Sequence, residues 1–157
     1  MVSQSAPTTR EEALAVLNAT REELRRAIKG LTPDQMIAPA VDGWSVKDIL
    51  THISSWDELM ATDFRRLARG HQPALMHFSR DKTDEWNNAT MSMRLKLPLD
   101  QVLSETESSR NELITTLDAL PDTAFTSGFV PMVLGICGRH DEEHSELIDK
   151  WRKGVGI

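Results

Sequence analysis

The chain has 157 residues, a length that suits a single domain, and its 39% hydrophobic and 27% charged residues are ordinary proportions for a globular protein. The formal net charge is -6 and no long basic run is present, so binding to nucleic acid is not expected. The single cysteine, Cys137, excludes an intrachain disulfide and favours a reducing compartment.

The N-terminal residues and the longest apolar stretch bear on the expected cellular location. Residues 1–8 are polar and are predicted to form a disordered or loosely held tail, followed by one domain over residues 9–157. The longest apolar stretch, around residues 129–137, is interrupted by Pro131 and Gly135 and is too short to span a bilayer. A soluble cytoplasmic protein with no membrane partner is therefore expected.

The first two long helices are predicted from capping residues and from apolar periodicity. The first covers about 9–29 and begins with a Thr-x-x-Glu capping box. The second covers about 45–69, with Ser45 as the N-cap and Asp48 at the third helical position. Both segments carry apolar residues at helical spacing, which predicts that one face of each helix is buried.

The rest of the chain is predicted to hold a long crossover and two further long helices. The crossover covers 70–97 and includes a short helix around 82–94. The third long helix begins near Pro98, and the fourth covers roughly 133–153 or 139–153. Strand signals are poor because alternating runs are absent. Four long amphipathic helices without strands predict an all-α protein, a four-helix bundle.

The fourth helix carries two histidines one turn apart. At about 100° per residue, His140 and His144 share a stripe with Leu147, Ile148 and Trp151. Such an i, i+4 pair can place two imidazole nitrogens on one metal ion. A single inward histidine is more often a hydrogen-bonded core residue, but two stacked rings need more polar partners than an apolar core supplies. This spacing by itself leaves both a metal site and a pair of core histidines open.

The same residues also fit the H-x-x-E-H pattern of a class of zinc peptidases. Those enzymes need a further acidic ligand well downstream, and only 13 residues follow His144. The alternative H-E-x-x-H pattern is absent because Asp141 occupies its second position. A peptidase is therefore not predicted, and Glu143 is interpreted as a solvated helix charge.

His52 is the candidate third metal ligand. It lies at the flank of the apolar face of the second helix, one turn before Trp56. Alone it would be interpreted as a boundary residue, but helical bundles build metal sites from side chains on facing helices. Three histidine ligands leave coordination positions open for water or substrate, which is typical of catalytic sites. His71 and His77 lie in the crossover and are expected at the surface.

Several segments, in their order and spacing, resemble the DinB-like (DinB/YfiT) superfamily. Residues 43–52 (GWSVKDILTH) resemble the start of its second helix, and residues 140–144 (HDEEH) resemble its C-terminal H-x-x-x-H helix. Residues 84–87 (DEWN) and the later Ser109-Arg110 pair fit the same pattern. The resemblance covers nearly the whole chain, from about residue 9 to 152.

This resemblance implies an up-down-down-up bundle with the long crossover between the second and third long helices. It implies a site for zinc, nickel or a similar divalent ion on His52, His140 and His144. Many relatives form dimers, so a homodimer is expected. Characterised relatives include S-transferases and a maleylpyruvate isomerase that use low-molecular-weight thiols. A metal-free branch that resembles the colibactin self-protection protein lacks the histidine triad, so this chain is placed outside that branch.

Two further residues are candidates for the lining of a pocket beside the metal. Arg110 falls on the inner face of the third long helix, where it either forms an internal salt bridge or binds a carboxylate of a substrate or thiol cofactor. Trp56 follows His52 by one turn and could wall the pocket, although core packing is the simplest role of the four tryptophans. Cys137 is expected to be a packed small residue, with contact to the metal as the alternative.

Together these observations predict a metal-dependent enzyme acting on a small molecule, either a thiol-dependent S-transferase or a hydrolase. The metal would lower the pKa of a bound water or thiol and polarise the electrophile. The sequence identifies no catalytic residue. The alternative is a non-catalytic protein that binds or sequesters a small molecule in the bundle pocket for self-protection.

Overall fold

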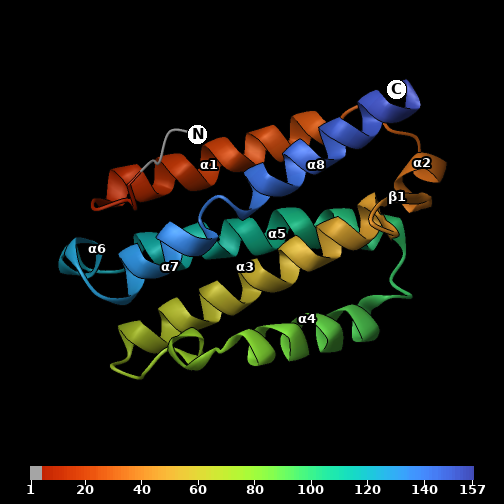
Figure 1. Cartoon of the computed structure of the whole chain (residues 1–157). Coiled ribbons are helices and arrows are strands. Elements are labelled where there is room, and N and C mark those ends of the chain that lie inside the picture. The colour runs from red at the N-terminus through yellow and green to blue at the C-terminus, as the bar shows by residue number, and fades with distance from the viewer. Residues whose placement is uncertain (1–4) are drawn as a thin grey trace.

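Four long helices form the body of the computed structural model, which describes residues 5–157. They are α1 (Arg10–Ile28), α3 (Val46–Ala68), α5 (Leu99–Asp118) and α8 (His140–Val155). In Figure 1, α1 and α8 run in one direction, and α3 and α5 run in the opposite direction. Helix α3 packs along α5, and α1 packs along α8. The prediction of an all-α four-helix bundle is confirmed.

Shorter elements connect the long helices. The helical ones are α2 (Pro33–Ile37), the 3-10 turn η1 (Ala74–His77), α4 (Arg80–Arg94), α6 (Thr123–Thr126) and α7 (Phe129–Cys137). Helix α4 is the short helix predicted in the crossover between α3 and α5. It lies beside α3 at the edge of the bundle in Figure 1.

The predicted N-terminal caps are present, one in full and one in part. The Ser45 hydroxyl accepts a hydrogen bond from the backbone N–H of Asp48, and the Asp48 carboxylate accepts one from the backbone N–H of Ser45. At the start of α1, the Thr9 hydroxyl accepts from the N–H of Glu12. The Glu12 carboxylate, however, accepts from the N–H of Thr8, so the reciprocal half of the expected capping box is replaced.

A two-stranded antiparallel hairpin, β1 (Pro39–Val41) and β2 (Trp44–Ser45), precedes α3 and was not predicted. Its turn consists of Asp42 and Gly43, which have φ angles of 49° and 87°. Positive φ at both central residues is typical of a type I′ turn, for which Asp-Gly is a preferred sequence. This hairpin lies against α8, so it becomes a wall beside the functional face of that helix.

The C-terminal helical region is divided into α7 and α8, and α8 starts at His140, close to the later of the two expected starts. Gly138 follows α7, and a Cβ atom added there would lie 2.4 Å from the Leu134 carbonyl oxygen, so only glycine fits this close approach. Helix α8 continues past Lys153 to Val155. It ends where Gly156 takes a left-handed conformation, with φ of 77°.

The bundle interior has two apolar clusters with a polar layer between them. One cluster includes Leu17, Phe64 and Leu117, and the other includes Leu24 and Ile53. Buried polar residues of α1, α3, α5 and α8 lie between them along the chain: Thr20, Arg21, Ser54, Ser55, Asp57, Thr106, Ser109, Arg110, Asp141 and Ser145. This layer crosses the bundle at the level of the histidines of α8.

Across residues 5–157, no helix has the length and apolar character needed to cross a membrane. Of the tail expected over residues 1–8, residues 1–4 lie outside the described part of the chain. In the remainder, Pro7 is buried and the backbone N–H of Thr8 bonds to Glu12.

Candidate metal centre

Helices α3 and α8 bring His52, His140 and His144 together. The Nε2 atom of His140 lies 3.0 Å from Nε2 of His52 and 3.1 Å from Nε2 of His144. One potential ligand atom from each ring lies within 4.8 Å of those of the other two. The three residues that the sequence singled out thus converge on one point between two facing helices.

Aromatic side chains surround this point and fix the orientation of the rings. The Trp44 ring lies 5.3 Å from that of His52, and the Trp56 ring lies 6.4 Å from that of His52 and 6.2 Å from that of His140, all edge-to-face. His52 is 7% exposed, whereas His140 and His144 are partly exposed. The centre is therefore closed on the α3 side and retains an open side along α8.

Burial keeps the three imidazoles uncharged. It lowers the pKa of His52 to about 4, with a further contribution from His144. It lowers the pKa of His140 to about 2, and the neighbouring histidines and the Arg110 and Arg21 charges act in the same direction. Burial also lowers the pKa of His144, against an opposing effect of Asp141. Near neutral pH each ring therefore has a nitrogen lone pair available for a metal.

The residues fit a divalent metal ion by donor type and by spacing. Two nitrogen ligands at the usual zinc distance and a tetrahedral angle are about 3.3 Å apart, close to the Nε2 separations found here. Within the described chain, the cluster contains no carboxylate or thiol besides the three histidines. Three neutral donors leave room for a further ligand. The Nδ1 atoms of His52 and His144 are buried and have no partner in the described chain, so packing rather than hydrogen bonding holds these rings.

Trp56 connects the histidines with the crossover helix. Its indole N–H donates to the Asn87 side-chain oxygen at 2.9 Å, and its ring lies 6.4 Å from that of Phe78. Phe78 in turn lies 6.3 Å from Trp86. The structure thus places Trp56 beside the histidines and in contact with α4, whereas its role as a pocket wall stays a prediction. Sequence reasoning noted the Trp86-Asn87 pair only as part of the family resemblance.

Arg110 lies in the polar layer and has acidic partners. Its guanidinium donates to both carboxylate oxygens of Asp57, at 3.1 and 3.0 Å, to Asp141 at 2.9 Å, and to the Leu17 carbonyl oxygen at 2.7 Å. This is the internal salt bridge that was one of the two alternatives for Arg110. These contacts do not favour the other alternative, in which Arg110 binds a carboxylate of a ligand.

Arg21 completes a cluster of two arginines and two aspartates that the sequence analysis missed. It donates to Asp141 at 2.6 Å, to Asp57 at 2.8 Å and to the Thr106 carbonyl oxygen. The four side chains come from four different helices, and all are at least 98% buried. A signal was available in the sequence, because Arg21 falls four residues after Leu17 on the inner stripe of α1. Asp141 directly follows His140, so this cluster lies next to the histidines.

The remaining candidate residues do not belong to the histidine cluster. His71 and His77 are exposed, as predicted. Cys137 is half-buried and packs against the apolar cluster that contains Phe64, as expected for a small packed residue. Burial, and secondarily Glu143, raises the pKa of its thiol to about 11, which disfavours the thiolate form.

The open side of the centre leads to a cavity of about 170 Å³. His144 forms part of its wall, together with Trp44, Ile49 and Leu147. Residues 41–42 of the hairpin also line it. A small molecule can therefore approach the histidines from the groove between α8 and the hairpin.

The family model described as the DinB superfamily matches residues 16–148, most of the chain. The chain belongs to the DinB superfamily. This match confirms the resemblance that the GWSVKDILTH and HDEEH segments carry.

Solved structures share the DinB-like fold at low sequence identity. An uncharacterised protein from Escherichia coli UTI89 is 15% identical, with a TM-score of 0.82 and 97% of each chain covered. The colibactin self-resistance protein ClbS, solved in complex with a dsDNA, is 14% identical, with a TM-score of 0.82, and the match covers 95% of this chain and 98% of that one. The sibling lethal factor precursor DfsB is 17% identical, with a TM-score of 0.73 and coverage of 94% and 97%. No match was found among curated proteins.

Proposed function

We propose that this DinB superfamily member is a metal-dependent enzyme that acts on a small molecule, as a thiol-dependent S-transferase or a hydrolase. One observation carries the proposal: Nε2 of His140 lies 3.0 Å from Nε2 of His52 and 3.1 Å from Nε2 of His144, and His144 lines a cavity beside this cluster of neutral imidazoles. Three protein ligands with an open side are typical of catalytic rather than structural sites.

His52, His140 and His144 would hold a divalent ion, zinc or nickel by ligand type. When bound, such an ion lowers the pKa of a coordinated water or thiol and polarises an electrophile. Trp44 and Trp56 exclude water from the buried side of the histidines, and the lower dielectric there strengthens electrostatic effects on a bound substrate. No residue is assigned as a general base. The nucleophile is a thiol if the protein is an S-transferase and water if it is a hydrolase.

The test is the metal content of the protein purified without a histidine tag. About one divalent ion per chain is expected, and His144→Ala should lose most of it, because two ligands rarely hold a labile divalent ion tightly. His77→Ala is the matched control, since His77 is exposed in the crossover and distant in sequence from the centre. Wild-type metal content in His144→Ala would contradict the assignment.

A second candidate is a non-catalytic protein that captures a small molecule. It is supported by a cavity beside the histidines and by the likeness to the structure of a self-resistance protein. Turnover of an electrophile in the presence of a low-molecular-weight thiol supports the enzyme, whereas stoichiometric capture without turnover supports the binding protein. The homodimer expected from the resemblance stays a prediction.

A further inference from the structure

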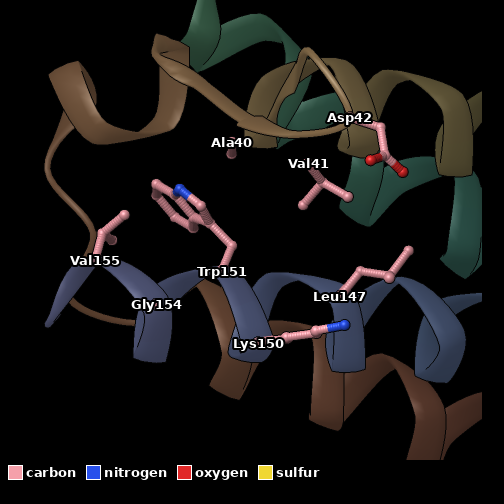
Figure 2. Close-up of a pocket in the computed structure, with 8 residues that line it drawn as sticks. All are labelled: Ala40, Val41, Asp42, Leu147, Lys150, Trp151, Gly154 and Val155. Atoms are coloured by element: carbon pink, nitrogen blue, oxygen red, sulfur yellow. The ribbon is translucent and has the colours of Figure 1, made fainter.

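A second, larger cavity of about 460 Å³ lies between the hairpin and the C-terminal half of α8. Figure 2 shows its walls: residues 40–42 on one side and, from α8, Leu147, Lys150, Trp151 and residues 154–155 on the other. The volume falls within the range of about 300–1,000 Å³ that is usual for small-molecule sites. None of the metal-centre histidines lines this cavity.

The large cavity borders the smaller cavity that lies beside the histidines. It shares Val41, Asp42 and Leu147 with the smaller cavity that His144 lines. On α8, His144, Leu147 and Trp151 follow one another at spacings of three and four residues, so they lie on one face of the helix. A rise of 1.5 Å per residue puts Trp151 about 10 Å along the helix from His144.

The walls of the large cavity carry accessible apolar side chains beside two charged ones. The Trp151 ring projects into the space between α8 and the hairpin in Figure 2. Leu147 is 40% exposed and Val155 is 58% exposed, both unusual for large aliphatic side chains. A concave site lined by a partly buried aromatic side chain and exposed aliphatic ones is typical of a surface that binds an apolar ligand.

One carboxylate and one ammonium group border this apolar space. Asp42 lies on the hairpin wall and Lys150 on the α8 wall (Figure 2). Both are solvent-accessible, and their opposite charges offset each other, so the cavity favours neither an anionic nor a cationic body. An uncharged body suits it best, because the two wall charges sum to zero and give no net attraction to an ion, whereas the carbon surfaces of Leu147 and Trp151 favour apolar contact.

We propose that the large cavity binds the uncharged aryl or alkyl body of the molecule whose reacting group lies at His52, His140 and His144. The ligand class is an amphipathic small molecule in which about 10 Å separates the apolar body from the reacting group. The position of the reacting group rests on the proposed function, whereas binding of the apolar body does not.

The test uses a variant that fills the cavity without disturbing the histidines. Gly154 lines the cavity, and a Cβ atom added there meets no atom within 4 Å. Gly154→Leu should therefore fold, with a higher helix propensity than the wild type. Lys153→Leu is the matched control, because it adds the same side chain at an exposed position of α8 that does not line the cavity. Equal metal content and circular dichroism spectra establish that both variants are intact.

The probe is 4-phenyl-1-butanol, titrated by calorimetry into the full chain as purified and again after treatment with a chelator. Binding to both forms is expected, with a change in the NMR signal of the Trp151 indole N–H. Gly154→Leu should bind about tenfold more weakly, the effect of losing burial of a phenyl ring, and Lys153→Leu should bind like the wild type. Equal binding by Gly154→Leu and the wild type, or an unchanged Trp151 signal, overturns the proposal.

A pair of thiols tests the connection between the cavity and the metal centre. On the metal-loaded chain, 4-phenylbutane-1-thiol should bind about tenfold more tightly than phenylmethanethiol, because only the longer thiol can place its ring in the cavity. Gly154→Leu should remove this difference. Equal affinities in the wild type overturn the proposal, since the apolar body then gains nothing from the cavity. If the chain holds no metal but 4-phenyl-1-butanol still binds at Trp151, the proposed function fails and the cavity remains an apolar binding site.

Discussion

At the scale of single residues, the histidines show how burial prepares a side chain for chemistry. An exposed imidazole is half protonated near pH 6.5, and a protonated ring cannot bind a metal. Burial beside Trp44 and Trp56 favours the neutral form of His52 and extends its ability to bind a metal to lower pH. The same burial has a cost for the metal-free protein, since the unfolded chain takes up protons that the folded chain excludes.

We expect the free energy of unfolding of the metal-free protein to fall as the pH drops from about 6.5 to about 4. Above pH 6.5 the imidazoles are neutral in both states, whereas below it the unfolded chain binds protons that His52 does not bind until about pH 4. The loss is about 1.4 kcal/mol per pH unit for each additional proton. Urea unfolding at a series of pH values, with His52→Asn compared with the wild type, measures it.

Comparing the pH dependence of the free energy of unfolding of His52→Asn with that of the wild type separates the contribution of His52 from that of the carboxylates, which both proteins share. His52→Asn should show a shallower pH dependence than the wild type. Identical slopes for His52→Asn and the wild type between pH 6.5 and 5 would show that His52 is not the buried neutral group described here.

At the scale of helices, the polar layer determines how the four long elements meet. Asp57 and Asp141 are each shared by Arg21 and Arg110, so one charge-balanced cluster links α1, α3, α5 and α8. A buried charge pair tolerates few alternative arrangements, because each guanidinium needs its acceptors at fixed angles. Since Asp141 adjoins His140, the cluster lies next to the first histidine of α8.

Arg110→Lys should lower the thermal stability and leave both metal content and turnover per folded molecule intact. A single ammonium cannot reproduce the bidentate contact with Asp57. The loss of charge-assisted hydrogen bonds in a buried site lowers the free energy of unfolding by about 2 kcal/mol. Thermal unfolding and metal analysis of the same preparation provide the measurement. Arg65→Lys is the control, because the Arg65–Glu112 ion pair is largely exposed and should contribute little. Reduced turnover at unchanged stability would instead identify Arg110 as a ligand-binding residue.

At the scale of the whole molecule, charge bears on the choice of partner. A similar fold has been solved in complex with a dsDNA, but the identity is 14%, which establishes a shared fold and no shared partner. This chain carries a net charge of -6, and binding to DNA depends on the neutralisation of phosphates by lysine and arginine. Long-range repulsion should therefore oppose the approach of a duplex.

We accordingly expect no appreciable binding to duplex DNA at about 0.15 M salt. Gel shifts with a short duplex, repeated at lower salt, provide the measurement. Weak binding that appears only at low salt agrees with the prediction. A tight complex at physiological salt would contradict it, and would assign a nucleic-acid partner to this chain as well.

Local features of the sequence determined the long helices and the family. The Ser45–Asp48 capping box placed the start of α3, and the spacing of His140 and His144 placed both rings on one face of α8, because these depend only on neighbours within a turn. The hairpin was missed even though Asp42-Gly43 is a strong turn signal, since the flanking strands are too short to show alternation. The start of α3 and the histidine face of α8 could therefore be predicted without information about distant residues.

Tertiary structure alone decided which residues meet. The sequence left His52 between a boundary residue and a ligand, because periodicity gives the face of a helix but not the helix that it faces. Only the packing of α3 against α8 brings Nε2 of His52 to 3.0 Å from Nε2 of His140. Arg110 was likewise open between two roles until folding supplied Asp57 and Asp141 as partners. The cavity beside Trp151 exists only because the hairpin folds over α8, and contacts between segments about a hundred residues apart cannot be obtained from local propensity.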